Sequence, residues 1–208
     1  IISQFSNFII QTTEQKWLRR IGGIILAISL ILGSAIIVWF MIAVVTKINY
    51  WLGIVIQVIL LASCFAGRSL NKAAQDVLQP LSNGDIKEAR SRLSLYVGRD
   101  TDNLSPREIL RAVLETVAEN SVDGVTSPLF FAILGTLIPS VGPVPMAMAY
   151  KAASTLDSMI GYKKEPLRDL GWFSAKLEDY LTYIPCRLTV LTLALISAKP
   201  QQVLSLCY

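Results

Sequence analysis

The chain has 208 residues, of which 53% are hydrophobic and only 16% charged, and its mean hydropathy is +0.52. A water-soluble domain of this size would have too little polar surface with such a composition, so the sequence indicates a membrane protein. The net charge is +4, but the lysines and arginines lie beside apolar runs and do not alternate with aromatic residues, which argues against a nucleic-acid partner.

The N-terminal segment, residues 1–67, is predicted to form a transmembrane hairpin. Residues 21–46 carry no charge and exceed the roughly 20 residues needed to cross a bilayer. A second uncharged run, 48–67, returns across the membrane. The first run follows a basic and aromatic cluster that is typical of a cytoplasmic interface, formed by Lys16, Trp17, Arg19 and Arg20. We therefore expect a cytoplasmic amino terminus.

Residues 68–124 are polar and are predicted to form cytoplasmic amphipathic helices. An Asn-Gly-Asp sequence at 83–85 marks a turn between two of them. Ser105 and Glu108 match a capping box with a proline between them, so a helix should begin there and continue through Glu119. Its apolar residues fall on one stripe and its charged residues on another.

Residues 125–150 form an uncharged run that helix breakers interrupt. These are Pro128, Gly135, Pro139, Gly142, Pro143 and Pro145. A single crossing would leave the basic segment 151–187 outside the cytoplasm, against the positive-inside rule. We therefore favour a Pro/Gly-broken re-entrant or hairpin membrane element that returns 151–187 to the side of 68–124, with the single crossing as the alternative. The last segment, 188–208, begins a further membrane helix.

Carboxylates, lysines and hard cations must supply any chemistry, because the chain has no histidine and its three cysteines are far apart. Glu115 and Glu119 lie one helical turn apart, and the following loop adds Asn120, Ser121 and Asp123. Such a set of oxygen ligands suits Mg²⁺ with a nucleotide phosphate. The simpler interpretation of these residues is a solvated helix face that ends in a polar turn.

Two further polar segments carry candidates at helical spacing. Lys151, Ser154 and Asp157 follow the interrupted run, where a lysine could hold a phosphate and an aspartate a metal. An interfacial helix with a snorkelling lysine is the alternative. Lys176 and Asp179 share a face of the next predicted helix, for which an ordinary amphipathic helix is the alternative. The shorter sequence Arg-Asp-Thr at 99–101 is a further candidate, for which a salt-linked turn is the alternative.

Four separated strings of the chain form one ordered pattern. They are VGRDT at 97–101, ETVAENSVDG at 115–124 running into SPLF at 127–130, AYK at 149–151 with TLDSMIGY at 155–162, and the segment 174–189. In order and approximate spacing, over residues 10–195, they resemble the cobinamide-phosphate synthase family (CobD/CbiB). The family's Gly-Asp-Pro and His-Pro region and its Ser-Pro-Asn-Ala-Gly region have no counterpart here. We therefore expect a form truncated at both ends, for which inactivity is an open alternative.

The resemblance implies an all-α, polytopic enzyme of the cell (inner) membrane that acts in cobalamin (vitamin B12) biosynthesis. The implied reaction is ATP-dependent amide ligation of aminopropanol or its phosphate to adenosylcobyric acid, giving adenosylcobinamide or its phosphate. Its implied cofactors are ATP and Mg²⁺, and the lipid bilayer is its surroundings. Because a carboxylate is a poor electrophile, such a reaction needs phosphoryl activation and cationic side chains that neutralise the developing charge.

Within this framework the candidate residues receive roles. The catalytic candidates are Glu119, Asn120, Asp123, Lys151 and Asp157, and the metal candidates among them are Glu119, Asp123 and Asp157. The substrate-binding candidates are Arg99, Asp100, Ser154, Lys176, Asp179 and Arg187. We also expect Asp123 and Asp157 to share one site at the membrane surface, because the two ends of a returning element emerge as neighbours.

Two other functional classes stay open. A transporter of a corrinoid or small solute is favoured by the broken apolar segment bordered by charges, as in discontinuous transport helices. Against it, no charged residue lies deep within the apolar runs of the sequence. A membrane scaffold with a cytoplasmic helical domain is the third class, and it would not require Asn120, Asp123 or Asp157.

Overall fold

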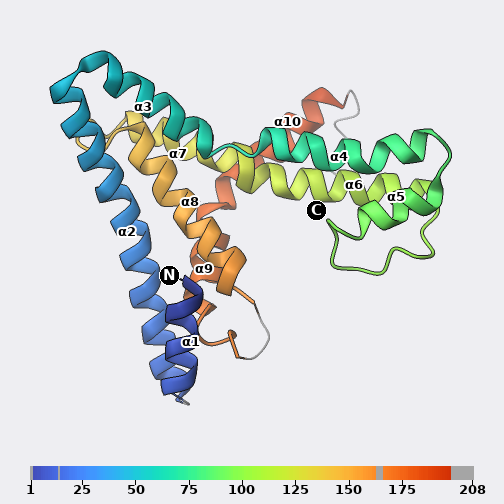
Figure 1. Cartoon of the computed structure of the whole chain (residues 1–208), viewed down its shortest axis with the longest axis horizontal. Coiled ribbons are helices and arrows are strands. Elements are labelled where there is room, and N and C mark those ends of the chain that lie inside the picture. The colour runs from blue at the N-terminus through green and yellow to red at the C-terminus, as the bar shows by residue number, and fades with distance from the viewer. Residues whose placement is uncertain (1, 14, 163–165, 198–208) are drawn as a thin grey trace. The chain divides into compact units, whose positions relative to one another are not determined.

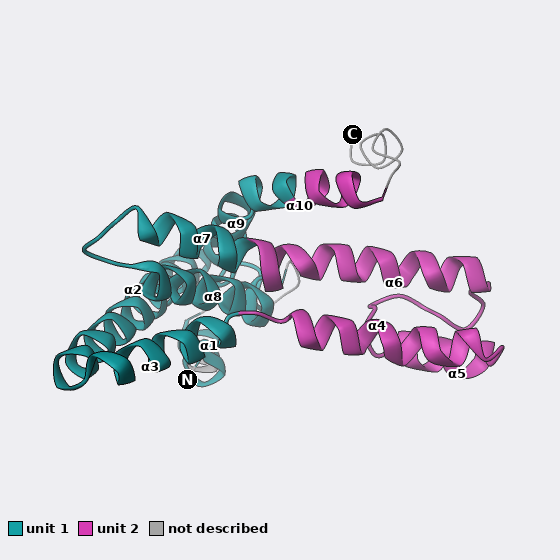
Figure 2. Ribbon diagram, turned by 90° about the horizontal axis from the view of Figure 1, so that it is seen from above, with its two compact units in different colours: residues 1–64, 127–188 teal, residues 65–126, 189–208 magenta. Residues whose placement is uncertain are grey.

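The computed structural model describes residues 2–13, 15–162 and 166–197, and every regular element in these ranges is a helix (Figure 1). Two compact units divide the chain: residues 1–64 with 127–188, and residues 65–126 with 189–208 (Figure 2). Two stretches are long and apolar enough to cross a membrane, and a bent helix pair could supply a third. The predicted all-α membrane architecture is confirmed.

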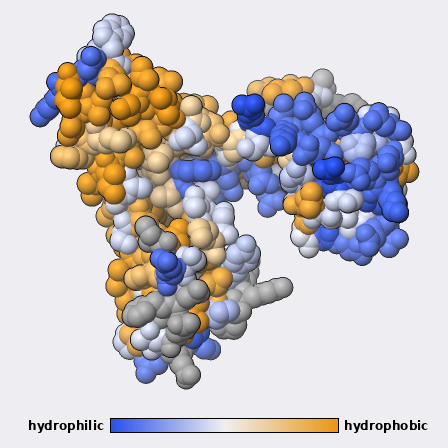
Figure 3. Space-filling view, in the orientation of Figure 1, coloured by the Kyte–Doolittle hydropathy of each residue, from blue (hydrophilic) through white to orange (hydrophobic). Residues whose placement is uncertain are grey.

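The first unit is built on a hairpin of α2 (Lys16–Ile48) and α3 (Tyr50–Ser63), with the short α1 (Ile2–Thr12) beside it. At a rise of 1.5 Å per residue, α2 is about 50 Å long, well above the roughly 30 Å apolar thickness of a bilayer. One residue, Asn49, makes the turn, and its side-chain oxygen accepts a hydrogen bond from the Leu52 amide at 3.1 Å. Most of the surface of this hairpin is apolar, as expected of helices that contact lipid (Figure 3).

The second hairpin of this unit consists of α7 (Ser127–Thr136) and α8 (Pro143–Ile160), which pack against each other. The loop between them ends at Gly142, whose φ of +85° favours glycine. Pro143 occupies the first position of α8, where a missing N–H leaves no hydrogen bond unmade. The chain turns back as a helical hairpin, as predicted, with Pro139 in the loop and the other breakers near helix ends. That this hairpin lies in the membrane stays a prediction.

Helix α8 runs antiparallel to α2. Near the α7–α8 loop, the Trp39 indole N–H donates to the Ser140 carbonyl at 2.9 Å. At the other end of α8, Leu156 and Ile160 pack into a buried cluster with Leu26 of α2. The end of α8 therefore lies toward the Lys16 end of α2, and the α7–α8 loop lies toward the α3 end.

A polar contact fastens the basic end of α2 to the segment after α8. Arg20 Nε lies 2.9 Å from Asp169 Oδ1, and the Asp169 side chain is only 6% exposed. The Arg20 guanidinium also lies over the ring of Trp172, at the start of α9 (Trp172–Leu181). The backbone of α2 also contacts the backbone of the segment before α9, since a Cβ on Gly23 would overlap the carbonyl oxygen of Leu170. Helix α10 (Tyr183–Ile196) follows α9 at a bend of 46°.

The second unit contains α4 (Gly67–Ser82), α5 (Ile86–Leu93), α6 (Pro106–Ser121) and a short π-helix, η1 (Val122–Thr126). Its buried core is the apolar cluster of Val77, Ala89, Leu93, Ile109, Ala112 and Val113. The predicted capping box is present, with Ser105 N–H donating to Glu108 at 2.7 Å. The predicted turn is present too, because Gly84 has a φ of +82° and Asp85 caps α5.

We expect Gly23→Ala to destabilise the protein, because the added methyl group would collide with the backbone of Leu170. Overpacking of this kind costs about 1–3 kcal/mol. Gly33→Ala in the same helix is the matched control, since no atom lies within 4 Å of the added Cβ. Thermal unfolding in detergent, followed by circular dichroism, should show a lower midpoint for Gly23→Ala alone. Equal midpoints for the two variants would contradict the close approach.

Candidate functional site

A polar groove of about 500 Å³ lies on the second unit, between α6, η1 and the segment that follows α5. It is lined by Tyr96, Val97, Gly98, Arg99, Glu115, Thr116, Glu119, Asn120 and Asp123. Four of the predicted site residues therefore face one groove: Arg99, Glu119, Asn120 and Asp123. Asp100 lies outside this lining, where its carboxylate accepts a hydrogen bond from the Asp102 amide at 2.9 Å.

An ion-pair network holds Arg99 at the rim of the groove. Arg99 Nη2 lies 2.9 Å from Glu115 Oε2, and Arg111 Nε lies 2.7 Å from Glu115 Oε1. The hydrogen bonds from Arg111 and then Arg99 lower the pKa of the Glu115 carboxyl below its ordinary value of 4.5. Because the pKa is lower in the folded state, the network favours folding above pH 4.5 and loses this effect as the pH falls through the lowered value.

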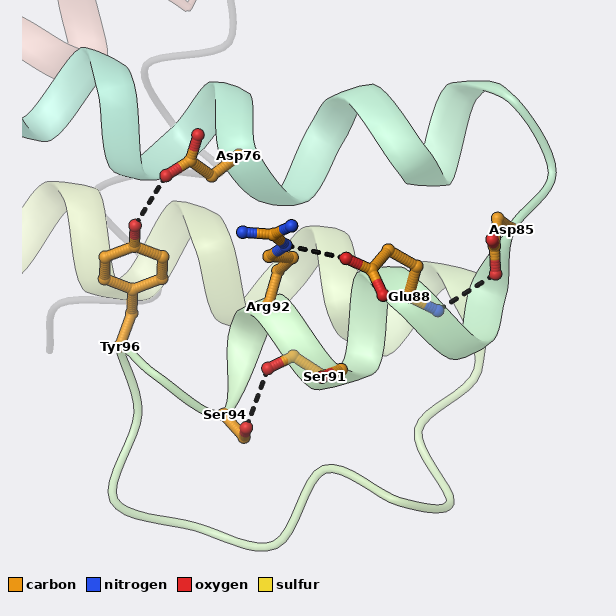
Figure 4. Close-up of polar contacts among 7 residues, drawn as sticks. All are labelled: Asp76, Asp85, Glu88, Ser91, Arg92, Ser94 and Tyr96. Atoms are coloured by element: carbon orange, nitrogen blue, oxygen red, sulfur yellow. Dashed lines mark hydrogen bonds and ion pairs between the residues drawn. The ribbon is translucent and has the colours of Figure 1, made fainter.

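The sequence placed Glu115 in the carboxylate-rich segment without giving it a role, and it did not predict Tyr96 as a site residue. Glu115 opens the ETVAENSVDG string, and its pairing with Arg99 depends on a loop contact that helical spacing cannot reveal. Tyr96 immediately precedes the VGRDT string, and its hydroxyl donates to Asp76 Oδ2 of α4 at 2.8 Å (Figure 4). This hydrogen bond raises the pKa of Tyr96, so the phenol stays protonated and fixed at the wall of the groove.

The floor of the groove is shaped by the π-helix η1, which begins directly after α6. Such single-turn π segments are rare and occur often at functional sites. Asp123 lies in the first turn of η1, half-buried, whereas Glu119 and Asn120 are exposed on α6. Asn120 Nδ2 donates to the Thr116 carbonyl at 2.8 Å, which fixes the side chain and leaves its amide oxygen as an acceptor.

A contact with the start of α4 holds η1 in place. The Gly124 carbonyl accepts a hydrogen bond from the Ala66 amide at 2.8 Å. This bond uses a backbone N–H that the N-terminus of a helix would otherwise leave unpaired. Gly124 is buried, and a Cβ at this position would lie 2.8 Å from the Ala66 Cβ, so only glycine fits here without a shift.

The predicted residues of the first unit lie along α8. Lys151 is about halfway along this helix and half-buried, Ser154 is buried, and Asp157 is half-buried beside Gly161. Because α8 is antiparallel to α2, Lys151 falls at the level of the middle of the α2 apolar run and not at its end. A charged side chain at this depth is costly in lipid and marks a functional position by default.

The remaining candidates engage local partners. Lys176 Nζ lies 3.6 Å from Asp179 Oδ2 on the exposed face of α9. The Arg187 guanidinium lies over the ring of Tyr183, 3.5 Å from its centroid, and donates to the carbonyl of the same residue at 2.8 Å. Asp123 and Asp157 belong to different units, so the shared site that the sequence predicts stays a prediction.

Within the described ranges, no group of three or more Cys, Asp and Glu side chains gathers closely enough to enclose a metal ion. Mg²⁺ that arrives with a nucleotide needs fewer protein ligands, since it usually keeps several waters and takes one or two carboxylates beside the phosphates. Glu119 and Asp123, with the amide oxygen of Asn120, line one groove and fit this second type of site.

A sequence model of the CobD/Cbib protein family matches residues 1–207. The chain is 58% identical to a cobalamin biosynthesis protein CobD from Synechocystis sp. over 97% of its own length and 59% of the relative. It is 47% identical to a cobalamin biosynthesis protein CbiB from Salmonella arizonae over 85% of its length and 53% of the relative. The chain thus spans little more than half of these relatives. No solved structure matches it.

We expect Gly124→Ala to displace η1, because the new methyl group would press on the Ala66 Cβ. A loss of about 1–3 kcal/mol in unfolding free energy is typical of such overpacking. Adding Ala66→Gly to this variant removes the opposing methyl group and should restore the stability. Gly67→Ala is the control, since the space around that residue is open. The unfolding free energies of the three variants are measured by chemical denaturation. If Ala66→Gly does not restore the stability of Gly124→Ala, the added methyl group does not collide with Ala66.

Proposed function

The chain belongs to the CobD/CbiB family, and we propose on this basis that its protein joins aminopropanol or aminopropanol phosphate to adenosylcobyric acid in an ATP-dependent amide ligation. The observation that carries the proposal is the groove of the second unit, where two strings of the family pattern come together. The VGRDT string supplies Arg99, and the ETVAENSVDG string supplies Glu119, Asn120 and Asp123.

The groove offers both kinds of side chain that such a ligation needs. Glu119 and Asp123 would hold Mg²⁺ with the nucleotide phosphates, and the bound ion would neutralise charge during phosphoryl transfer. Arg99, held by Glu115, would bind a carboxylate or phosphate of the substrate through its guanidinium. The amide of Asn120 is fixed by Thr116 and would orient a substrate group by hydrogen bonding.

On α8 of the first unit, Lys151, Ser154 and Asp157 remain catalytic and substrate-binding candidates for this reaction. Lys151 would neutralise a phosphate, and Asp157 would act as a base or metal ligand. We place the groove and the α9 segment on the cytoplasmic side of the inner membrane, where ATP is available. The proposed orientation rests on the basic bias of 68–124 and 151–187 and on the cluster at the start of α2.

A transporter of a corrinoid or small solute is the second candidate, and the position of Lys151 favours it. A charged residue level with the middle of a spanning helix is typical of substrate and ion pathways. The two functions differ in their chemistry. Only a ligase should hydrolyse ATP in response to cobyric acid and aminopropanol with an amide as product, whereas a transporter should move solute across a vesicle membrane without forming one.

In the full-length protein, Glu119→Gln and Asp123→Asn should each lower the rate of corrinoid amidation about 100-fold or more, because each removes a charge that would hold the metal. For the exposed Glu119, the unfolding free energy should change by no more than about 0.5 kcal/mol. For the half-buried Asp123, the unfolding free energy is measured beside the activity to show that the variant is folded. Glu88→Gln, which removes an exposed carboxylate of α5 away from the groove, is the control. Amidation assays with purified variants test this, and turnover near that of the parent in both variants would exclude the two residues from the site.

The sequence predicts that 68–124 and 151–187 lie on the same, cytoplasmic side. Since Lys151 is level with the middle of α2, the proposed orientation now predicts cytoplasmic access for 68–124 and for the part of 151–187 after the end of α8. With the native cysteines replaced by alanine, Lys87→Cys and Tyr162→Cys should both resist an impermeant maleimide in intact cells. Both should react when the cytoplasmic face is exposed in inverted vesicles. If position 162 is labelled in intact cells and position 87 is not, the segment after α8 lies on the opposite side.

A further inference from the structure

A second groove, of about 450 Å³, lies on the first unit at the end of α2 far from Lys16. Its lining changes from polar to apolar along α2. Thr46 and Lys47 of α2 with Gln57 of α3 form a polar end, whereas Trp39 and Pro145 form an apolar end. An adjoining hollow of about 230 Å³ continues along α2 past Ile36. The groove is therefore amphipathic.

The groove lies at the depth where a phospholipid changes from headgroup to acyl chain. Lys47 is the first charged residue after the uncharged stretch 21–46, and the aromatic residues Tyr50 and Trp51 follow it. Basic and aromatic residues at the end of a span mark the interface of a bilayer. Trp39 is about 12 Å deeper along α2, at the level of the acyl chains. Its hydrogen bond to Ser140 holds the α7–α8 loop against α2 and so shapes the wall of the groove.

The charge of the polar end favours an anion. No carboxylate occurs in the sequence between Glu14 and Asp76, and the described part of the chain gives Lys47 no ion-pair partner. The Thr46 hydroxyl is buried against Gly53 of α3, so it is not available to a ligand in the groove. The start of α8 contributes little, because prolines at 143 and 145 remove two of its backbone N–H donors. Lys47 is thus the cation of this site.

We propose that this groove binds an anionic phospholipid of the surrounding bilayer. Its phosphate would lie at Lys47 Nζ, and one acyl chain would lie along Trp39 and Ile36. Gln57 lines the polar end, where its amide donates to the Gly53 carbonyl at 3.4 Å. A zwitterionic lipid fits less well, because no carboxylate is near to receive a choline or ethanolamine cation.

The test is native mass spectrometry of the full-length protein after reconstitution in nanodiscs with equal amounts of palmitoyl-oleoyl phosphatidylglycerol and phosphatidylcholine. The parent protein should retain phosphatidylglycerol about fivefold over phosphatidylcholine after transfer to detergent, the preference expected of one lysine at the membrane surface. Lys47→Gln should abolish the preference and Lys47→Arg should keep it. Lys16→Gln, at the opposite end of α2, should leave it unchanged.

A shape variant separates the groove from the charge alone. Ala43 lines the groove, and Ala43→Phe would fill it while leaving Lys47 in place, so the retained phosphatidylglycerol should fall in this variant as well. Equal retention of the two lipids by the parent protein would overturn the proposal. So would an equal effect of Lys16→Gln and Lys47→Gln, or full retention by Ala43→Phe. Unchanged helical content by circular dichroism shows that each variant is folded.

Discussion

Every backbone polar group of the first unit that faces lipid must find its hydrogen-bond partner within the protein, and this requirement governs the whole unit. It explains why six prolines and glycines between 125 and 150 leave two intact helices. The breakers lie in the first turns of α7 and α8, in the last turn of α7 and in the connecting loop, where the Val141 and Gly142 amides both donate to the Ile138 carbonyl. The hairpin therefore carries a sharp turn without exposing unpaired backbone groups in the α7–α8 loop.

In the second unit this requirement is relaxed, because polar groups on its surface can form hydrogen bonds to water. Here a break in the regular helix is used to build a groove. The π-helix after α6 carries Asp123 on its first turn, and the contact between Gly124 and Ala66 fixes it to α4. The exposed arginines pair with Glu115 and position Arg99 at the groove, while such solvent-exposed ion pairs contribute little to the stability of the fold.

Local signals in the sequence predicted much of this architecture. The capping box at Ser105 and the turn at Gly84 involve neighbouring residues, so their chemistry can be read directly from the chain. Contacts between distant segments were beyond such reasoning. The pairing of Arg99 with Glu115 and the depth of Lys151 depend on packing between elements, and the π-helix has no distinctive composition. Three of the predicted site residues that line the groove, Glu119, Asn120 and Asp123, were close in sequence, which is why they could be grouped.

The depth of Lys151 has a consequence for how the protein is made. Helix α7 has 10 residues, about 15 Å, so it is too short to cross a bilayer, and α8 carries a charge that lipid alone would not accept. Neither helix is a suitable independent substrate for the insertion machinery. The α2–α3 hairpin is translated before α7 and α8, and between Arg20 and the end of α3 its only charged residue is Lys47 at the turn. Biogenesis should therefore be sequential, with the later hairpin entering the membrane only as it docks on a surface that is already there.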